Sequence, residues 1–180
     1  MARKISRPLR YRVRRPLAIV GLLLLFVLLR LLASDVSRPS GPESLSEGAY
    51  RVQRVVDGDT LLLEGGARVR LIGADTPETV QPNHAVEPYG PEATAYTEQF
   101  VHDAGGEVRL QMDRERKDRF DRFLAYVFAG DRMLNEELIR AGLATARTEF
   151  DYSESMKRRF RRAEEAAKAA ELGIWNSNSP

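Results

Sequence analysis

Three short strand-like segments, joined by two tight-turn signals, constrain the fold of this chain more than any other feature. Residues 49–56, 60–63 and 67–72 carry apolar residues among polar ones, as strands with one buried face do. Asp57-Gly58-Asp59 separates the first two segments and Gly65-Gly66 separates the second two, and both are turn sequences. The pattern predicts a three-stranded meander in which neighbouring strands are antiparallel.

The remainder of the body adds two strands and three helices. A helix is expected to begin at Gly90-Pro91 and to end at Gly105-Gly106, because proline favours the first helical position and glycine favours helix ends. Further strands are predicted at 108–112 and 123–128, a short helix at 135–141, and a last helix from about residue 153 to Gly173. Together these elements indicate an α+β domain with a closed sheet, of the oligonucleotide-binding (OB) barrel type.

Apolar stripes run along the two longer predicted helices. The first stripe consists of Ala93, Tyr96, Phe100 and Ala104, and the second of Met156, Phe160, Ala163, Ala167 and Ala170. We interpret the second stripe as core packing, and we expect Ile174-Trp175 to pack back on the body.

A basic segment followed by an apolar run opens the chain. Residues 1–15 hold seven basic side chains, and residues 17–33 are apolar except for Arg30. This order is typical of a secretory signal or a signal anchor, and the positive-inside rule then places the C-terminal body across the membrane. The run is just long enough to span a bilayer. Leu31-Leu32-Ala33 is a poor cleavage sequence, which favours a retained anchor, although a cleaved signal and a secreted protein stay open.

The chain is therefore divided into a basic cytoplasmic tail (1–16), a transmembrane signal-anchor helix (17–33), a linker rich in Ser, Pro, Gly and Glu (34–48), a folded domain (49–176) and a short tail (177–180). The folded domain is expected on the extracytoplasmic side.

Composition limits the chemistry of the folded domain. The chain has no cysteine and only two histidines, which excludes disulfides, thiolate metal sites and a cysteine nucleophile and disfavours zinc. Any metal would be held mostly by oxygen, as calcium, magnesium and manganese are.

The basic charge of the chain belongs to its N-terminus. Residues 1–38 hold nine basic and one acidic side chain, whereas residues 39–180 hold 19 basic and 25 acidic ones. An acidic body does not offer nucleic acid a broad basic face. A nucleic-acid substrate would have to be held locally, by a few arginines and a metal ion.

Two aspartates, a glutamate and two arginines form a set suited to phosphodiester chemistry. Asp59 follows a turn and Asp75 ends a strand, so adjacent strands can bring both carboxylates to one hard cation. Glu78 can orient or deprotonate a water molecule. Arg70 and Arg122 carry planar guanidinium groups that match phosphate oxygens. Each of these residues taken alone is equally compatible with an ordinary turn, strand or solvated loop.

The order of the motifs is more specific, and it resembles the thermonuclease (staphylococcal nuclease) family. The matching pieces are Asp-Gly-Asp-Thr at 57–60, Arg-x4-Asp-Thr-Pro-Glu at 70–78, Tyr-Gly-Pro-Glu-Ala at 89–93, Asp-x3-Arg at 118–122 and Asn-Glu-x-Leu-x3-Gly-Leu-Ala at 135–144. The resemblance covers residues 48–176. It implies a five-stranded OB barrel with three helices and Ca²⁺-dependent cleavage of DNA and RNA, with phosphate left on the 3′ side.

The resemblance also implies roles for individual residues. Asp59, Asp75 and the carbonyl of Thr76 match the calcium ligands, and Asp57 matches a nearby acidic partner. Glu78 matches the water-activating carboxylate. Arg70 and Arg122 match the arginines that bind phosphate and stabilise the transition state. Substrate contacts are implied for Arg119, Phe120 and Phe150.

Departures from the family pattern fall in substrate binding. Phe120 stands in place of a tyrosine, Thr148 in place of an aromatic residue and Asp121 in place of a glycine, and lysines are absent around 81–85. The expected partners are DNA and RNA, preferentially single-stranded or accessible, and the membrane; no obligate protein partner is evident. Two alternatives stay open: a module on the same fold that binds nucleic acid or protein without cutting, and a structural protein of the membrane surface.

Overall fold

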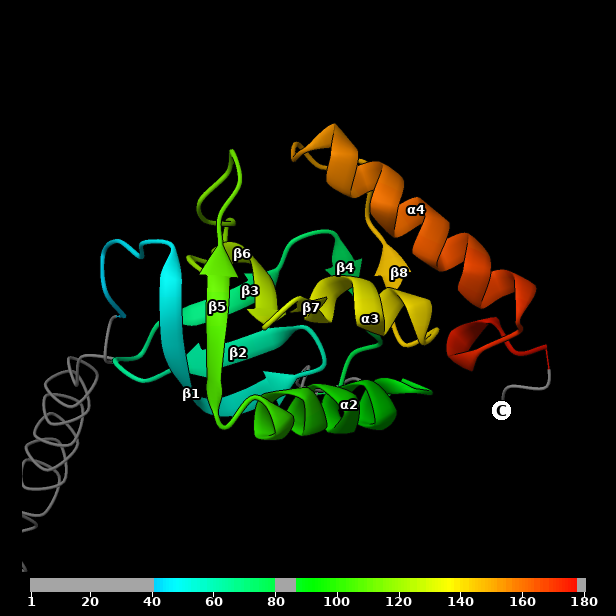
Figure 1. Cartoon of the computed structure of the whole chain (residues 1–180), viewed down its shortest axis with the longest axis horizontal. Coiled ribbons are helices and arrows are strands. Elements are labelled where there is room, and N and C mark those ends of the chain that lie inside the picture. The colour runs from blue at the N-terminus through cyan, green and yellow to red at the C-terminus, as the bar shows by residue number, and fades with distance from the viewer. Residues whose placement is uncertain (1–40, 80–86, 178–180) are drawn as a thin grey trace, which may run out of the picture. The chain divides into compact units, whose positions relative to one another are not determined.

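The body forms a closed five-stranded barrel in the computed structural model, which describes residues 41–79 and 87–177. The barrel strands are β1 (Gly48–Asp57), β2 (Thr60–Leu63), β3 (Arg68–Leu71), β5 (Glu107–Gln111) and β6 (Phe123–Ala129). They pair in the order β3-β2-β1-β5-β6, and a parallel β3–β6 pairing closes the ring (Figure 1). The predicted meander and OB-type barrel are confirmed.

Strand β1 makes the closure possible because it belongs to both sides of the barrel. Its first half pairs with β5, from Gly48 opposite Leu110, and its second half pairs with β2, from Val52 opposite Leu63. The register with β2 shifts twice along the strand. Such irregularities bend a strand and increase its twist. The ten residues of β1 can therefore pair with β5 in the first half and with β2 in the second.

Three helices cover the barrel as the sequence predicts. Helix α2 (Gly90–Asp103) contacts β1, and α3 (Leu134–Arg140) lies between β6 and α4 (Glu154–Ala169) (Figure 1). Phe160 of α4 is fully buried, with its ring 6.1 Å from the rings of Tyr126 and Tyr152. Burial of a phenylalanine contributes about 1.5–3 kcal/mol, so this residue is a main anchor of α4.

The centres of both predicted apolar stripes are buried, as expected, but the prediction is wrong for the last residue of the α4 stripe. Phe100, Ala163 and Ala167 are buried, whereas Ala170 is exposed because α4 ends one residue earlier. The 3₁₀ helix η1 (Gly173–Trp175) packs back on the body as expected, and the Ile174 N–H donates to the Gly142 carbonyl at 2.9 Å.

Three two-residue strands were not predicted. β4 (Ala74–Asp75) pairs with β8 (Thr145–Ala146), and β7 (Arg132–Met133) pairs with the end of β6. Strands this short carry no alternation of apolar and polar residues that a sequence pattern can reveal. The β4–β8 pair fixes the backbone of Asp75, one of the predicted metal ligands.

The predicted cytoplasmic tail, the anchor and residues 34–40 of the linker lie outside the described residues, as do positions 81–85 and the end of the chain. Within residues 41–79 and 87–177, no helix is long and apolar enough to cross a bilayer.

Asn135, at the start of α3, connects the two strands that close the barrel. Its side chain is fully buried, and its Oδ1 accepts the Val127 N–H at 2.9 Å. Its Nδ2 donates to the carbonyls of Ile72 at 2.9 Å and Ala125 at 3.3 Å. The Asn135 amide therefore continues the hydrogen bonding between the two strands beyond the point where the β3–β6 backbone pairing ends. It also fixes the path of the chain toward β4.

We expect Asn135→Leu to lower the free energy of unfolding by about 2–4 kcal/mol, because the substitution leaves buried backbone groups without partners. Urea denaturation monitored by circular dichroism measures the change. Gln99→Ala on the exposed face of α2 is the control, and it should stay within about 0.5 kcal/mol of the parent. Equal stabilities for Asn135→Leu and the parent would show that the hydrogen bonds of Asn135 do not stabilise the fold.

Candidate active site

The turn between β1 and β2 carries Asp57 and Asp59 and is held by α2. The Thr97 hydroxyl, fully buried on α2, donates to the Gly58 carbonyl at 2.6 Å. A Cβ at Gly58 would lie 2.7 Å from the Ala93 Cβ and 2.8 Å from the Thr76 Cγ2. The turn therefore requires glycine at its centre, because Ala93 of α2 and Thr76 leave no room for a side chain at this position.

The Asp59 carboxylate joins this turn to the end of β4. Its side chain is only 1% exposed. Its Oδ2 accepts the Thr76 N–H at 2.9 Å, and its Oδ1 accepts the Thr60 hydroxyl at 3.0 Å. A buried carboxylate needs such partners, and here they also bring two predicted metal ligands, Asp59 and Thr76, side by side.

Arg70 of β3 bridges the two predicted metal-binding carboxylates. Its guanidinium forms ion pairs with both Asp59 and Asp75, and its side chain is 19% exposed. Burial lowers the pKa of Arg70, and Asp75 opposes that shift. The two carboxylates thus lie close enough for one cationic group to join them.

This set of oxygen atoms fits a hard cation in part. Two carboxylates and the Thr76 carbonyl are the ligand types that calcium prefers, and calcium takes six to eight oxygens. Among the described residues, no group of three or more His, Cys, Asp or Glu side chains could hold a metal. Water and substrate oxygens would therefore complete any coordination shell.

Arg122 is held at the site by Asp118. The Asp118 Oδ2 accepts from the Arg122 Nε at 2.8 Å, and its Oδ1 accepts the backbone N–H groups of Phe120 and Arg122. Asp121, which stands in place of a glycine, pairs with Lys117 at 2.7 Å and is 82% exposed. Its φ of 62° is a left-handed conformation, which explains why glycine suits this position in the family pattern.

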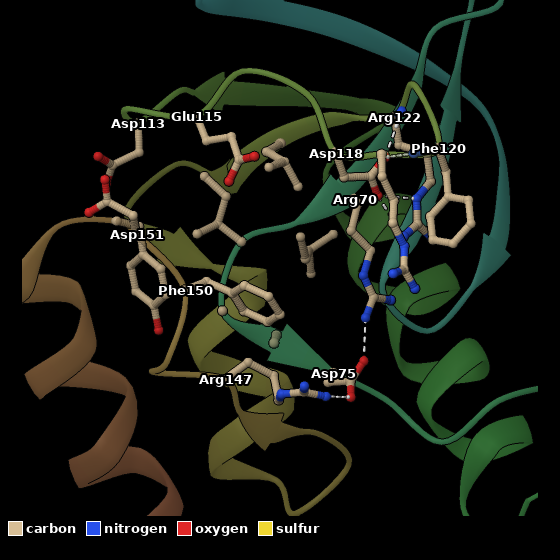
Figure 2. Close-up of a pocket in the computed structure, with 17 residues that line it drawn as sticks. Arg70, Asp75, Asp113, Glu115, Asp118, Phe120, Arg122, Arg147, Phe150 and Asp151 are labelled. Carbon is tan, nitrogen blue, oxygen red and sulfur yellow. Dashed lines mark hydrogen bonds and ion pairs between the residues drawn. The ribbon is translucent and has the colours of Figure 1, made fainter.

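The predicted site residues meet in two adjoining pockets. A pocket of about 330 Å³ is lined by Asp57, Asp59, Arg70, Asp75, Thr76, Glu78, Phe120 and Arg122, together with Arg68 and Pro77. A second pocket of about 440 Å³ shares four of these residues and adds Arg119 and Phe150 (Figure 2). We call them the phosphate pocket and the larger pocket. Thr148 lines neither of them.

Glu78 belongs to the segment between β4 and α2, and it lines the phosphate pocket. Its backbone N–H donates to the Glu87 Oε2 at 3.0 Å, and its carbonyl accepts the Glu87 N–H at 3.0 Å. These bonds join the chain at Glu78 to the chain at Glu87, so the backbone at Glu78 is fixed on the edge of the phosphate pocket.

Arg147 is a site residue that the sequence interpretation missed. Its Nη1 pairs with the Asp75 Oδ2 at 2.6 Å, and its guanidinium lies 5.4 Å from the Phe150 ring centroid. Figure 2 shows Asp75 between the Arg70 and Arg147 side chains. The β4–β8 pairing places Arg147 there, and the motif order carries no signal for it.

This OB barrel brings the carboxylates of its first turn and of β4 into one pocket with Arg70 of β3 and Arg122 next to β6. Arginine side chains in such a pocket are suited to binding phosphate groups. The comparison with known families is specific: the family described as Staphylococcal nuclease homologue matches residues 68–177. The chain belongs to this family, which confirms the resemblance inferred from the motifs.

Relatives match over most of the chain. The thermonuclease of Staphylococcus hyicus is 37% identical over 169 residues, which cover 87% of this chain and 96% of that protein. The thermonuclease of Staphylococcus intermedius is 39% identical, over 86% of this chain and 95% of that protein. Endonuclease YncB of Bacillus subtilis (strain 168) is 34% identical, over 71% of this chain and 61% of that protein.

Burial raises the pKa of Asp57, while Arg70, the hydrogen bond from Thr60 and Arg122 act in the opposite direction. A raised carboxyl pKa means that the native state holds its proton more tightly than the unfolded state. The contribution of the Asp57 carboxyl group to the free energy of unfolding is therefore fully present below its ordinary pKa. This contribution is lost as pH rises through the raised pKa of the native state.

We expect Asp57→Asn, which removes the buried charge, to unfold at higher urea concentration than the parent at pH 7 without metal. The difference should shrink as pH falls toward 4. Urea titrations of both proteins at several pH values measure this. A variant that is less stable than the parent at pH 7 would show that the Arg70 and Arg122 attractions outweigh burial.

Proposed function

We propose that the protein is a calcium-dependent nuclease that hydrolyses phosphodiester bonds of DNA and RNA and leaves 3′-phosphates. The observation that carries the proposal is the phosphate pocket, which gathers Arg70, Arg122, Asp59, Asp75 and Glu78. The relatives with which the chain shares its family are named thermonucleases and endonucleases.

The two arginines bind the phosphate of the bond that is cut. In the absence of substrate each is paired with carboxylates, Arg70 with Asp59 and Asp75 and Arg122 with Asp118. A phosphate entering the pocket offers both guanidinium groups oxygen acceptors in matching geometry. Charge builds on these oxygens as phosphorus becomes five-coordinate, so positioned cations stabilise the transition state more than the ground state.

Asp59, Asp75 and the Thr76 carbonyl would hold the calcium ion. When bound there, the ion supplies positive charge that polarises the phosphate. The buried, hydrogen-bonded position of Asp59 and the β4–β8 pairing that fixes Asp75 keep these ligands in place.

Glu78 accepts the proton of the attacking water. The water oxygen bonds to phosphorus, the bond from phosphorus to the 5′ oxygen breaks, and the 5′ oxygen leaves as an alcohol after taking up a proton. The products are a 3′-phosphate and a 5′-hydroxyl. The fixed backbone at Glu78 supports this role, because a general base must be held within hydrogen-bond reach of the water.

The alternative function is a module that binds nucleic acid in the same pockets without cutting. Thr148 favours it, because this residue lines neither pocket and cannot stack on a base. The complete set of acidic and basic residues in the phosphate pocket favours the enzyme.

We expect the purified full-length chain to cleave single-stranded DNA and RNA with Ca²⁺, and to lose this activity with a chelator. Glu78→Gln should lower the rate by about 10²–10⁴-fold, the usual contribution of a general base. Glu165→Gln, on the exposed face of α4, is the matched control and should cleave like the parent. A folded parent that binds nucleic acid but cuts with neither Ca²⁺ nor Mg²⁺ would establish the binding module instead.

We further propose that residues 17–33 keep the protein in the membrane with its folded domain outside the cytoplasm. The seven basic residues before the apolar run and the poor cleavage sequence support this topology. In a bacterial host the full-length chain should stay in the carbonate-washed membrane fraction, and added protease should digest the folded domain in intact spheroplasts. A shortened chain in the medium would instead establish a cleaved signal and secretion.

A further inference from the structure

The larger pocket continues directly from the phosphate pocket. The two share Arg70, Asp75, Phe120 and Arg122. Phe120 and Phe150 are 64% and 53% exposed, which is unusual for large apolar side chains, and both line the larger pocket. An exposed aromatic ring beside a phosphate site suits the stacking of a nucleic-acid base. On the proposed function, the base next to the bound phosphate would lie in the larger pocket.

Charge is divided between the two ends of the larger pocket. Its basic end contains four arginines, Arg70, Arg119, Arg122 and Arg147, against the two carboxylates of Asp75 and Asp118, and its other end contains Asp113, Glu115 and Asp151. Figure 2 shows these three acidic side chains together, on the opposite side of Phe150 from Asp75 and Arg147. Phosphate is repelled from the acidic end and attracted to the basic end, so the pocket orients a nucleotide with its base toward the carboxylates.

One carboxylate at the acidic end is available to a ligand. Asp113 accepts hydrogen bonds from the Tyr126 hydroxyl and the Ser153 N–H, and Asp151 pairs with Arg114 at 2.6 Å. Glu115 forms no hydrogen bond or ion pair with any other described residue. Glu115 is exposed, and it lines the larger pocket.

We propose that Glu115 selects the base in the larger pocket, favouring guanine most, then cytosine and adenine, over thymine and uracil. This inference rests on the proposed nuclease function. A carboxylate only accepts hydrogen bonds. Guanine offers it two adjacent donors on one edge, and cytosine and adenine offer one amino group each. Thymine and uracil present carbonyl oxygens on both sides of their single N–H, and these repel the carboxylate.

The test measures binding separately from cleavage. The full-length chain with Ca²⁺ is titrated with dGMP and with dTMP by calorimetry, and it is also given dT oligonucleotides that contain a single dG. We expect dGMP to bind about five- to tenfold more tightly than dTMP, near the lower end of the discrimination that paired hydrogen bonds to a base provide. Cuts in the oligonucleotides should concentrate beside the dG.

Glu115→Gln should bring the dGMP to dTMP affinity ratio close to one, because the amide offers both a donor and an acceptor. Glu107 is an exposed residue at the start of β5 and does not line the larger pocket. Glu107→Gln removes the same charge and should keep the parent affinity ratio. Cleavage without base preference, or a preference that survives Glu115→Gln, overturns the role of Glu115 and leaves the nuclease intact. Absence of both nucleotide binding and cleavage overturns the proposed function together with this inference.

Discussion

The buried carboxylate of Asp59 is the interaction on which the rest of the site depends. It accepts hydrogen bonds from the neighbouring Thr60 and from the Thr76 backbone beyond β4, and it pairs with Arg70 of β3. An isolated buried charge is costly, and it is tolerated only where hydrogen bonds and an opposite charge surround it. The requirement to satisfy one carboxylate therefore brings three segments of the chain to the same point.

Mutual neutralisation keeps the charges of the site in place before any substrate arrives. Arg70 and Arg147 lie on either side of Asp75, and Asp118 holds Arg122. A phosphate that binds must exchange these carboxylates for its own oxygens, so binding energy is partly spent on separating ion pairs. The exchange also releases carboxylates for a cation, so phosphate and metal ion are expected to favour each other's binding.

Much of the fold could be predicted from the sequence because its signals are local. Turn sequences at Gly58 and Gly65-Gly66, a proline at the start of α2 and the apolar stripe of α4 each specify an element within a few residues. The motif order identified the residues of the phosphate pocket. The β4–β8 pair escaped prediction because two-residue strands have no period, and Arg147 escaped with it. Thr97 and Asn135 are buried polar residues whose hydrogen-bond partners lie far away in sequence. No local sequence pattern predicts such contacts.

The order of the site residues along the chain has a consequence for biosynthesis. Asp59 and Arg70 leave the ribosome early, whereas Arg147 and helix α4 come much later. Chains are made from the N-terminus at a finite rate, so an unfinished polypeptide has the acidic half of the pocket without the wall that completes it. A nascent chain therefore lacks the complete lining of the site until Arg147 and Phe150 have been synthesised.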